Sequence, residues 1–112
     1  MGQENDPLLI YTTFEDIDDA RQVGRDLVQV RLAACVNIIP SMTSIYEWQG
    51  DLNEASEVVM LIKTRKACLE KALARAKELH PYDTPALLVI EPSAFDGAFA
   101  DWVVEQTDIS EH

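Results

Sequence analysis

The feature that most constrains the fold is a pair of long predicted strands in the middle of the chain. An apolar run, Ala-Ala-Cys-Val-Asn-Ile-Ile, occupies 33–39, and a strand pattern resumes at 43–48 after Pro40. Because proline removes a ladder donor, Pro40 predicts an edge, a bulge or a kink. A turn signal around Gly50 leads to a return strand at 56–63. Strands usually have about five or six residues, so this antiparallel pair is expected to project beyond a domain of 112 residues.

Strands and helices alternate around this pair. The continuous apolar segment 8–13 is β-prone and predicts a strand in the centre of the sheet. Asp16 or Asp18 can cap a following helix, whose apolar residues recur at helical spacing as far as Leu32. The remaining expected elements are a helix at 67–79 that ends at His80–Pro81, a strand at 85–90 and a helix at 95–106.

The order of these elements predicts the fold class. Two strand–helix–strand halves around a central, extended β-hairpin form the ferredoxin-like α+β pattern βαββαβ, here followed by a C-terminal helix. We expect a single domain over 1–112 with an ordered core at about 8–107. An open sheet leaves one face and its edges uncovered, and assembly with further copies through the long hairpin would cover them.

The charge of the chain argues against some classes of partner. The formal net charge is −11, whereas nucleic-acid and anionic-lipid binding need clustered Lys and Arg. No run of about 18 apolar residues predicts a membrane span, and the polar, acidic N-terminus does not resemble a secretory signal. We therefore expect a cytoplasmic protein with no nucleic-acid partner and no membrane partner.

The segment 80–85, His-Pro-Tyr-Asp-Thr-Pro, is the most distinctive local cluster of polar side chains. Two prolines make it rigid, and the imidazole of His80 with the carboxylate of Asp83 could hold a divalent transition metal. These are too few ligands for a closed site, so a second subunit or another strand would have to complete it. The alternative is a helix stop followed by a turn with His80 hydrogen-bonded locally, and local chemistry alone favours this alternative.

The two cysteines, Cys35 and Cys68, do not form a CxxC pair, which argues against a disulfide framework or a structural zinc site. Cys68 falls on the second predicted helix. Cys35 is a weak further candidate for a metal ligand or for a nucleophile paired with His80. Its apolar strand would raise the thiol pKa, so packing is the favoured interpretation.

Aromatic and charged residues follow the predicted hairpin. Tyr46 and Trp48 lie on its first strand, and aromatic residues of a projecting hairpin favour an interface. Glu57 and Lys63 on the return strand could form an ion pair within or between subunits. Further residues expected at a cleft or interface are Tyr82 and, on the apolar face of the last helix, Trp102.

Four blocks of the sequence resemble the CutA divalent-cation tolerance family. They are LAACVNIIP at 32–40, TSIYEWQG at 43–50, SEV with IKT between 56 and 64, and HPYDTP at 80–85. The resemblance covers roughly 8–107 and implies a ferredoxin-like fold and a compact homotrimer whose hairpins join neighbouring sheets. The implied architecture is similar to that of PII signalling proteins, and the implied role is tolerance of divalent metals, usually copper.

Some positions depart from the family pattern. Copper-assigned members carry a cysteine where this chain has Thr12, and a histidine pair where Leu79 precedes His80. Ala86 stands where many members have glutamate, and Glu47 stands where a basic residue is common. Of the expected copper ligands only His80 therefore carries over.

Three hypotheses follow for the function. The first is a non-enzymatic, trimeric metal-response protein that binds copper or another divalent metal. The second is a PII-like sensor of a small anionic or nucleotide ligand at subunit clefts, with Lys63 and Arg65 as the basic residues. The third is an enzyme with a cross-subunit site of Lys63, Tyr82 and His80, for which the sequence offers no catalytic motif, so we expect no enzyme.

Overall fold

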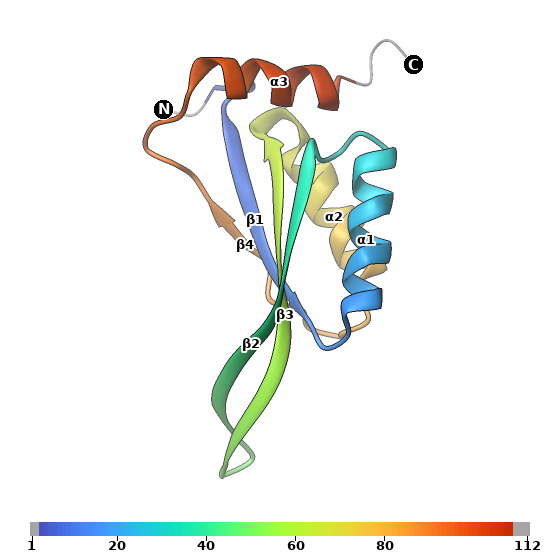
Figure 1. Cartoon of the computed structure of the whole chain (residues 1–112), viewed down its shortest axis with the longest axis vertical. Coiled ribbons are helices and arrows are strands. Elements are labelled where there is room, and N and C mark those ends of the chain that lie inside the picture. The colour runs from blue at the N-terminus through green and yellow to red at the C-terminus, as the bar shows by residue number, and fades with distance from the viewer. Residues whose placement is uncertain (1–2, 109–112) are drawn as a thin grey trace.

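The computed structural model describes residues 3–108 and has one four-stranded antiparallel sheet in the order β2-β3-β1-β4 (Figure 1). This is the ferredoxin-like arrangement, so the predicted fold class is confirmed. Helices α1 and α2 lie side by side on one face of the sheet, and α3 crosses one end. The elements are β1 Pro7–Phe14, α1 Ile17–Gln29, β2 Cys35–Trp48, β3 Asp51–Arg65, a 3-10 turn η1 Lys66–Cys68, α2 Leu69–Leu79, β4 Leu88–Ile90 and α3 Gly97–Thr107.

Strand β1 is central, as its continuous apolar sequence predicts. It pairs with β3 on one side and with β4 on the other. Alternate residues of β1 face the helices and are buried, namely Leu8, Ile10, Thr12 and Phe14. They pack with Met60 and Ile62 of β3 and with small residues of both helices in one core.

The helices pack closely because their contact residues are small. Asp16 caps α1 by accepting a hydrogen bond from the backbone N–H of Asp18 at 3.0 Å. Gly24 in α1 lies so near β2 that an added Cβ would be 3.1 Å from Val36 Cγ1. Ala72 and Ala76 of α2 are fully buried. The short side chains therefore determine how deeply the helices sit on the sheet.

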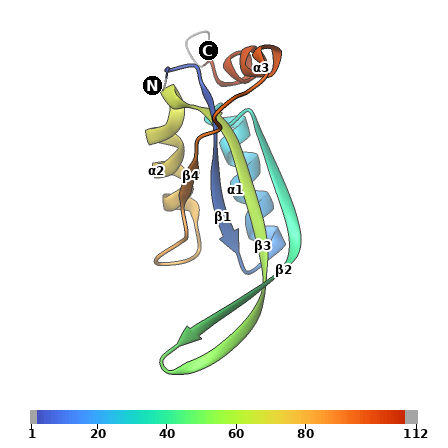
Figure 2. The same ribbon diagram turned by 90° about the vertical axis from the view of Figure 1, so that its left-hand side faces the viewer.

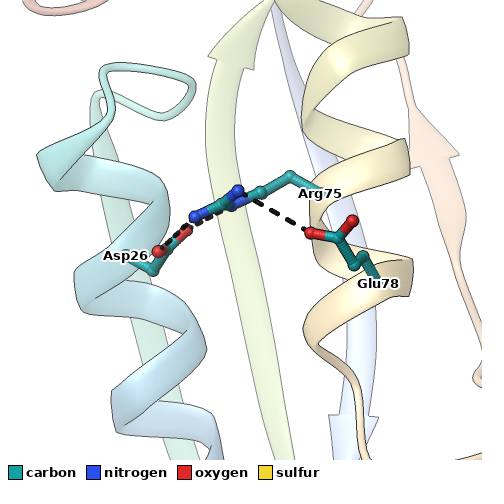
Figure 3. Close-up of polar contacts among 3 residues, drawn as sticks. All are labelled: Asp26, Arg75 and Glu78. Carbon is teal, nitrogen blue, oxygen red and sulfur yellow. Dashed lines mark hydrogen bonds and ion pairs between the residues drawn. The ribbon is translucent and has the colours of Figure 1, made fainter.

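A bidentate ion pair joins α1 to α2 across the outer surface of the helical layer (Figure 3). Arg75 Nε and Nη2 donate to the two carboxylate oxygens of Asp26, each at 2.8 Å. The hydrogen bond from Arg75 lowers the pKa of Asp26. Glu78 lies 3.7 Å from the same guanidinium and is more exposed.

The β2–β3 hairpin projects beyond the body of the domain, as predicted (Figure 1). Its register shifts between Ile39 and Met42, where Ser41 has a φ of 66°, so Pro40 marks a bulge in an edge strand. Beyond this bulge the hairpin projects as an arm, 42–57, away from the helices (Figure 1). The second view shows that the arm curves beneath the loop between α2 and β4 (Figure 2). The long axis of the molecule is 49 Å against 29 and 21 Å.

The C-terminal helix is held by arginine side chains. Arg65 Nε donates to Thr107 Oγ1 at 2.7 Å, and Arg31 donates weakly, at 3.4 Å, to the backbone carbonyls of Glu105 and Gln106. The Arg31 bonds, and a further one from Arg65 Nη2 to the carbonyl of Thr107 at 3.3 Å, satisfy carbonyls at the end of α3 that lack helical partners. Lys63 Nζ lies 6.0 Å from the centroid of the Phe99 ring.

The sheet face opposite the helices, here called the open face, carries exposed apolar side chains. Ile39 of β2 pairs with Val59 of β3, which pairs with Thr13 of β1, while Leu88 and Ile90 of β4 pair directly with odd-numbered positions of β1. These three side chains are 49%, 58% and 44% exposed. Within 3–108, no helix has the length and apolarity needed to cross a membrane.

Several element boundaries differ from the predictions. The return strand begins at Asp51 rather than at 56, because cross-strand pairing continues through polar residues to the tip. The fourth strand is only Leu88–Ile90, since the predicted segment begins with Pro85, which cannot donate a ladder hydrogen bond. Cys68 lies in the η1 turn that precedes α2. The last helix begins at Gly97, because the side chain of Asp96 caps it by accepting from the N–H of Phe99 at 3.0 Å.

Candidate functional site

His80 lies buried at the point where α2 ends. Pro81 stops the helix, and His80 adopts extended backbone, which turns its ring toward the end of β1. Its Nε2 is 2.8 Å from the carbonyl oxygen of Thr13, and its Nδ1 accepts a hydrogen bond from the backbone N–H of Tyr82 at 3.1 Å. The ring stacks on Phe14 with the centroids 4.3 Å apart.

These contacts define the protonation state of His80. With Nδ1 accepting, Nε2 must carry the proton that it donates to Thr13, so the imidazole is neutral. Burial lowers the pKa of His80, although the bond to Thr13 and the charge of Asp19 oppose this change. Both nitrogens thus have backbone partners, and a metal at His80 would have to displace one of them.

Tyr82 ties the loop after α2 to the base of the arm. Its hydroxyl donates to Glu57 Oε2 at 3.4 Å, while Ser44 donates to Glu57 Oε1 at 2.6 Å. Burial, followed by the negative charges of Glu57 and Glu15, raises the pKa of Tyr82 to about 12. Glu57 therefore joins both strands of the arm to the rigid 80–85 segment.

A cleft opens between the arm and this loop, and we call it the arm cleft. Its lining residues are Glu15, Tyr46, Ala55, Ser56, Glu57 and Tyr82, and its volume is 390 Å³. All six lie in the described part of the chain, and the only charged groups among them are carboxylates. The arm cleft is thus a negatively charged site with two phenol rings.

The other predicted residues lie apart from this cluster. Lys63 is six residues along β3 from Glu57, which corresponds to roughly 20 Å in a strand. The predicted ion pair of these two residues within one chain is therefore wrong, and Lys63 instead lies over Phe99. Cys35 pairs with Lys63 of β3, whereas Thr13, the hydrogen-bond partner of His80, pairs with Val59, four residues away on the same strand. Cys35 and His80 therefore lie at different levels of the sheet.

The remaining site residues are scattered over the surface. Asp83 is exposed in the loop after His80, and Trp48 near the arm tip is 64% exposed. Trp102 on α3 is 40% exposed and lies near Phe99. Across residues 3–108, no group of three or more His, Cys, Asp or Glu side chains is arranged to hold a metal ion.

Comparison with known proteins assigns the family. A family model described as CutA1 divalent ion tolerance protein matches residues 8–106. The chain belongs to the CutA1 family. The divalent-cation tolerance protein CutA of Thermus thermophilus is 40% identical over 100 residues, which are 89% of this chain and 95% of that protein. The CutA of Pyrococcus horikoshii is 37% identical over 89% of this chain and 97% of its own length.

Solved CutA1 structures have the same fold. The crystal structure of the divalent ion tolerance protein CutA1 from Ehrlichia chaffeensis superposes with a TM-score of 0.90 at 32% identity. The alignment covers 93% of this chain and 97% of that one. The CutA1 resemblance predicted from the four sequence blocks is therefore confirmed, as is the fold.

The sequence did not reveal three residues that build the site. Glu15 lines the arm cleft, Ser44 donates a hydrogen bond to Glu57 of that cleft, and Thr13 accepts from His80 through its carbonyl oxygen. A backbone carbonyl has no side-chain signature, so Thr13 could not have been found. Ser44 belongs to a CutA block, but only the pairing of β2 with β3 brings it to Glu57.

Proposed function

We propose that the chain is a trimeric, non-enzymatic protein of divalent-cation tolerance that works in the cytoplasm. The observation that carries this proposal is the match of the CutA1 model over 8–106. The exposed apolar residues of the open face and the projecting arm support assembly with further copies, since a lone chain leaves this surface in water. Light scattering should report the mass of three chains, and a stable monomer would contradict the trimer.

For the metal itself, we propose His80 and Asp83 as ligands for copper or another divalent cation, with Cys35 as a weaker candidate. The neutral imidazole of His80 suits a metal, because only an unprotonated nitrogen can coordinate. Binding would replace the hydrogen bond from Tyr82 N–H to Nδ1, or the bond between Nε2 and Thr13. Ligands from a neighbouring subunit would have to complete the coordination sphere.

Calorimetric titration with Cu²⁺ and with Zn²⁺ tests this assignment. We expect saturable binding that His80→Ala abolishes and Asp83→Asn weakens at least tenfold. Circular dichroism of His80→Ala checks that the variant is folded. Equal binding by wild type and both variants would exclude His80 and Asp83 as ligands while leaving the trimer and the family role intact.

A second candidate is a small-ligand sensor of PII-like architecture, and the arm cleft is the observation that favours it. The expected anionic ligand has less support. Lys63 lies over Phe99, and Arg65 is bonded to Thr107 and to Asn5, so neither basic residue lines the arm cleft. Thermal shift with nucleotides and small acids tests this version, and a rise of several degrees would favour it over the metal role.

The cytoplasmic location is supported only by the sequence. One CutA relative, from Arabidopsis thaliana, is named chloroplastic, and a CutA structure from Archaeoglobus fulgidus is named periplasmic. Cell fractionation with a tagged chain tests the proposal, and recovery outside the cytoplasmic fraction would overturn it.

A further inference from the structure

We propose that the arm cleft binds a small organic cation that carries a primary ammonium or guanidinium group. This inference goes beyond divalent-cation tolerance, because it concerns a different class of ligand and none of the predicted metal ligands. It rests on the charge, the aromatic lining, the free hydrogen-bonding capacity and the size of the arm cleft.

The charge of the arm cleft selects a cation. Glu15 and Glu57 are the charged residues among the six that line it, and all six belong to the described residues. A carboxylate can accept about four hydrogen bonds, and Glu57 receives two, from Ser44 and from Tyr82. Glu57 can therefore accept a further donor from a ligand without losing its present contacts.

The aromatic lining distinguishes an organic cation from a hydrated metal ion. Tyr46 and Tyr82 each contribute a ring to the arm cleft. Ammonium and guanidinium groups are attracted to aromatic faces, whereas Mg²⁺ and Ca²⁺ require six or more oxygen ligands. Two carboxylates beside two rings thus match an organic cation better than a hard metal ion.

The arm cleft has a suitable size and is held from three sides. Its 390 Å³ lies at the lower end of the usual volume for small-molecule sites, about 300–1,000 Å³. Glu15 follows β1, Tyr46 and Glu57 belong to the arm, and Tyr82 belongs to the loop after α2. The hydrogen bond between Tyr82 N–H and His80 fixes the start of that loop, and the Tyr82 hydroxyl bonds to Glu57 on the arm, so these contacts reduce the ordering that a ligand must impose.

Titration of the full chain with n-butylammonium and n-butylguanidinium, followed by chemical shifts of the tyrosine rings, tests the proposal. We expect saturable binding with shifts at Tyr46 and Tyr82. Glu15→Gln and Glu57→Gln should each weaken it at least fivefold, and Tyr46→Leu should weaken it as well. Glu15 is exposed, and within residues 3–108 its carboxylate makes no hydrogen bond or ion pair, so Glu15→Gln remains informative even if Glu57→Gln is unstable.

The control is Glu105→Gln, which removes one exposed charge on α3, away from the arm cleft. If Glu105→Gln weakens binding as much as Glu15→Gln does, the probe is attracted by the net charge of −11 of the whole chain and not by the arm cleft. The proposal would then be wrong. Binding of MgCl₂ that displaces butylammonium at equal concentration would also overturn it, as would absence of saturation at millimolar probe. None of these outcomes affects the trimer or the test of His80.

Discussion

At the scale of single residues, the hydroxyl of Thr12 stands out because it is fully buried with no hydrogen-bond partner. Among residues 3–108 it is the one buried side-chain polar atom in this state. Thr64, which is also fully buried, differs because its hydroxyl donates to the carbonyl of Leu32 at 2.7 Å. A buried polar group without a partner lowers stability, since it has lost its water.

Thr12→Val should therefore stabilise the protein. Valine has nearly the same shape but no hydroxyl, so we expect the free energy of unfolding to rise by about 1 kcal/mol. Thr64→Val, the matched control, should lower it by about 1 kcal/mol because the carbonyl of Leu32 loses its donor. Urea unfolding measures both variants, and a loss of stability in Thr12→Val would show that its hydroxyl has a partner.

His80 should make stability depend on pH. Its pKa in the folded state is lowered, mainly by burial, below the unfolded value near 6.5. The unfolded chain then binds more protons, so the contribution of His80 is complete above about pH 6.5 and is lost as pH falls from there toward the folded pKa. The loss cannot exceed about 1.4 kcal/mol per pH unit, the limit for one proton.

The measurement compares urea unfolding of the wild type and His80→Gln between pH 7.5 and pH 5, under conditions that keep the assembly state constant. Carboxylates titrate in both proteins, so the difference between the two curves isolates His80. We expect that difference to shrink as pH falls. A difference independent of pH would mean that the imidazole has the same pKa in the folded and unfolded states.

The sequence predicted local contacts of the site residues better than contacts between segments that are far apart in the chain. The local alternative for His80, a helix stop with the ring hydrogen-bonded nearby, matches its bond to Tyr82 N–H. The pairing of Glu57 with Ser44 and Tyr82 was not foreseen, because it depends on the twist of the arm beneath the loop. Side chains far apart in sequence meet only through such three-dimensional curvature.

At the scale of elements, α1 approaches β2 through Gly24, and this contact sets the distance between helix and sheet. An added Cβ would lie 3.1 Å from Val36 Cγ1 and 3.6 Å from Met60 Sδ. Val36 is β-branched and has few alternative rotamers, so it cannot move aside easily. Two opposite effects of a methyl group compete here, helix propensity and overpacking.

Gly24→Ala should destabilise the protein by about 1 kcal/mol. Alanine gains roughly 0.5–1 kcal/mol of helix propensity, but overpacking of a filled contact costs about 1–3 kcal/mol. Gly97→Ala in the first turn of α3 is the control, because its Cβ would meet nothing within 4 Å. Thermal unfolding should show a lower Tm for Gly24→Ala and an equal or higher Tm for Gly97→Ala; stabilisation by both would indicate a flexible contact at Val36.

The existence and order of the elements could be predicted, whereas some of their ends could not. A continuous apolar run located β1, and apolar periodicity located both long helices, since burial of one helix face produces that period. The arm is different, because its far half is mostly exposed and is held by cross-strand pairing rather than by burial. Hydropathy therefore missed the first residues of β3, from Asp51 to Ala55.

At the scale of the whole molecule, the two faces of the sheet differ in their cover. The helices bury one face, where Ile10, Phe14 and Ile62 are fully enclosed. The open face exposes Leu88 and Ile90 on the edge strand β4 and Ile39 at the base of the arm. The apolar character of this face follows from the sequence, but which surface of a second copy would cover it does not.

If the proposed trimer covers the open face, a charge placed there should weaken assembly. We expect Leu88→Lys, at a side chain 58% exposed in the single chain, to shift light scattering from three chains toward one. An ammonium group buried in an apolar contact without a partner is strongly unfavourable, so the shift should increase on dilution. Val30→Lys is the matched control, because Val30 is 40% exposed at the end of α1, on the helical side. If Leu88→Lys stays fully trimeric at low concentration, the subunits join through the arm and not through the open face at β4.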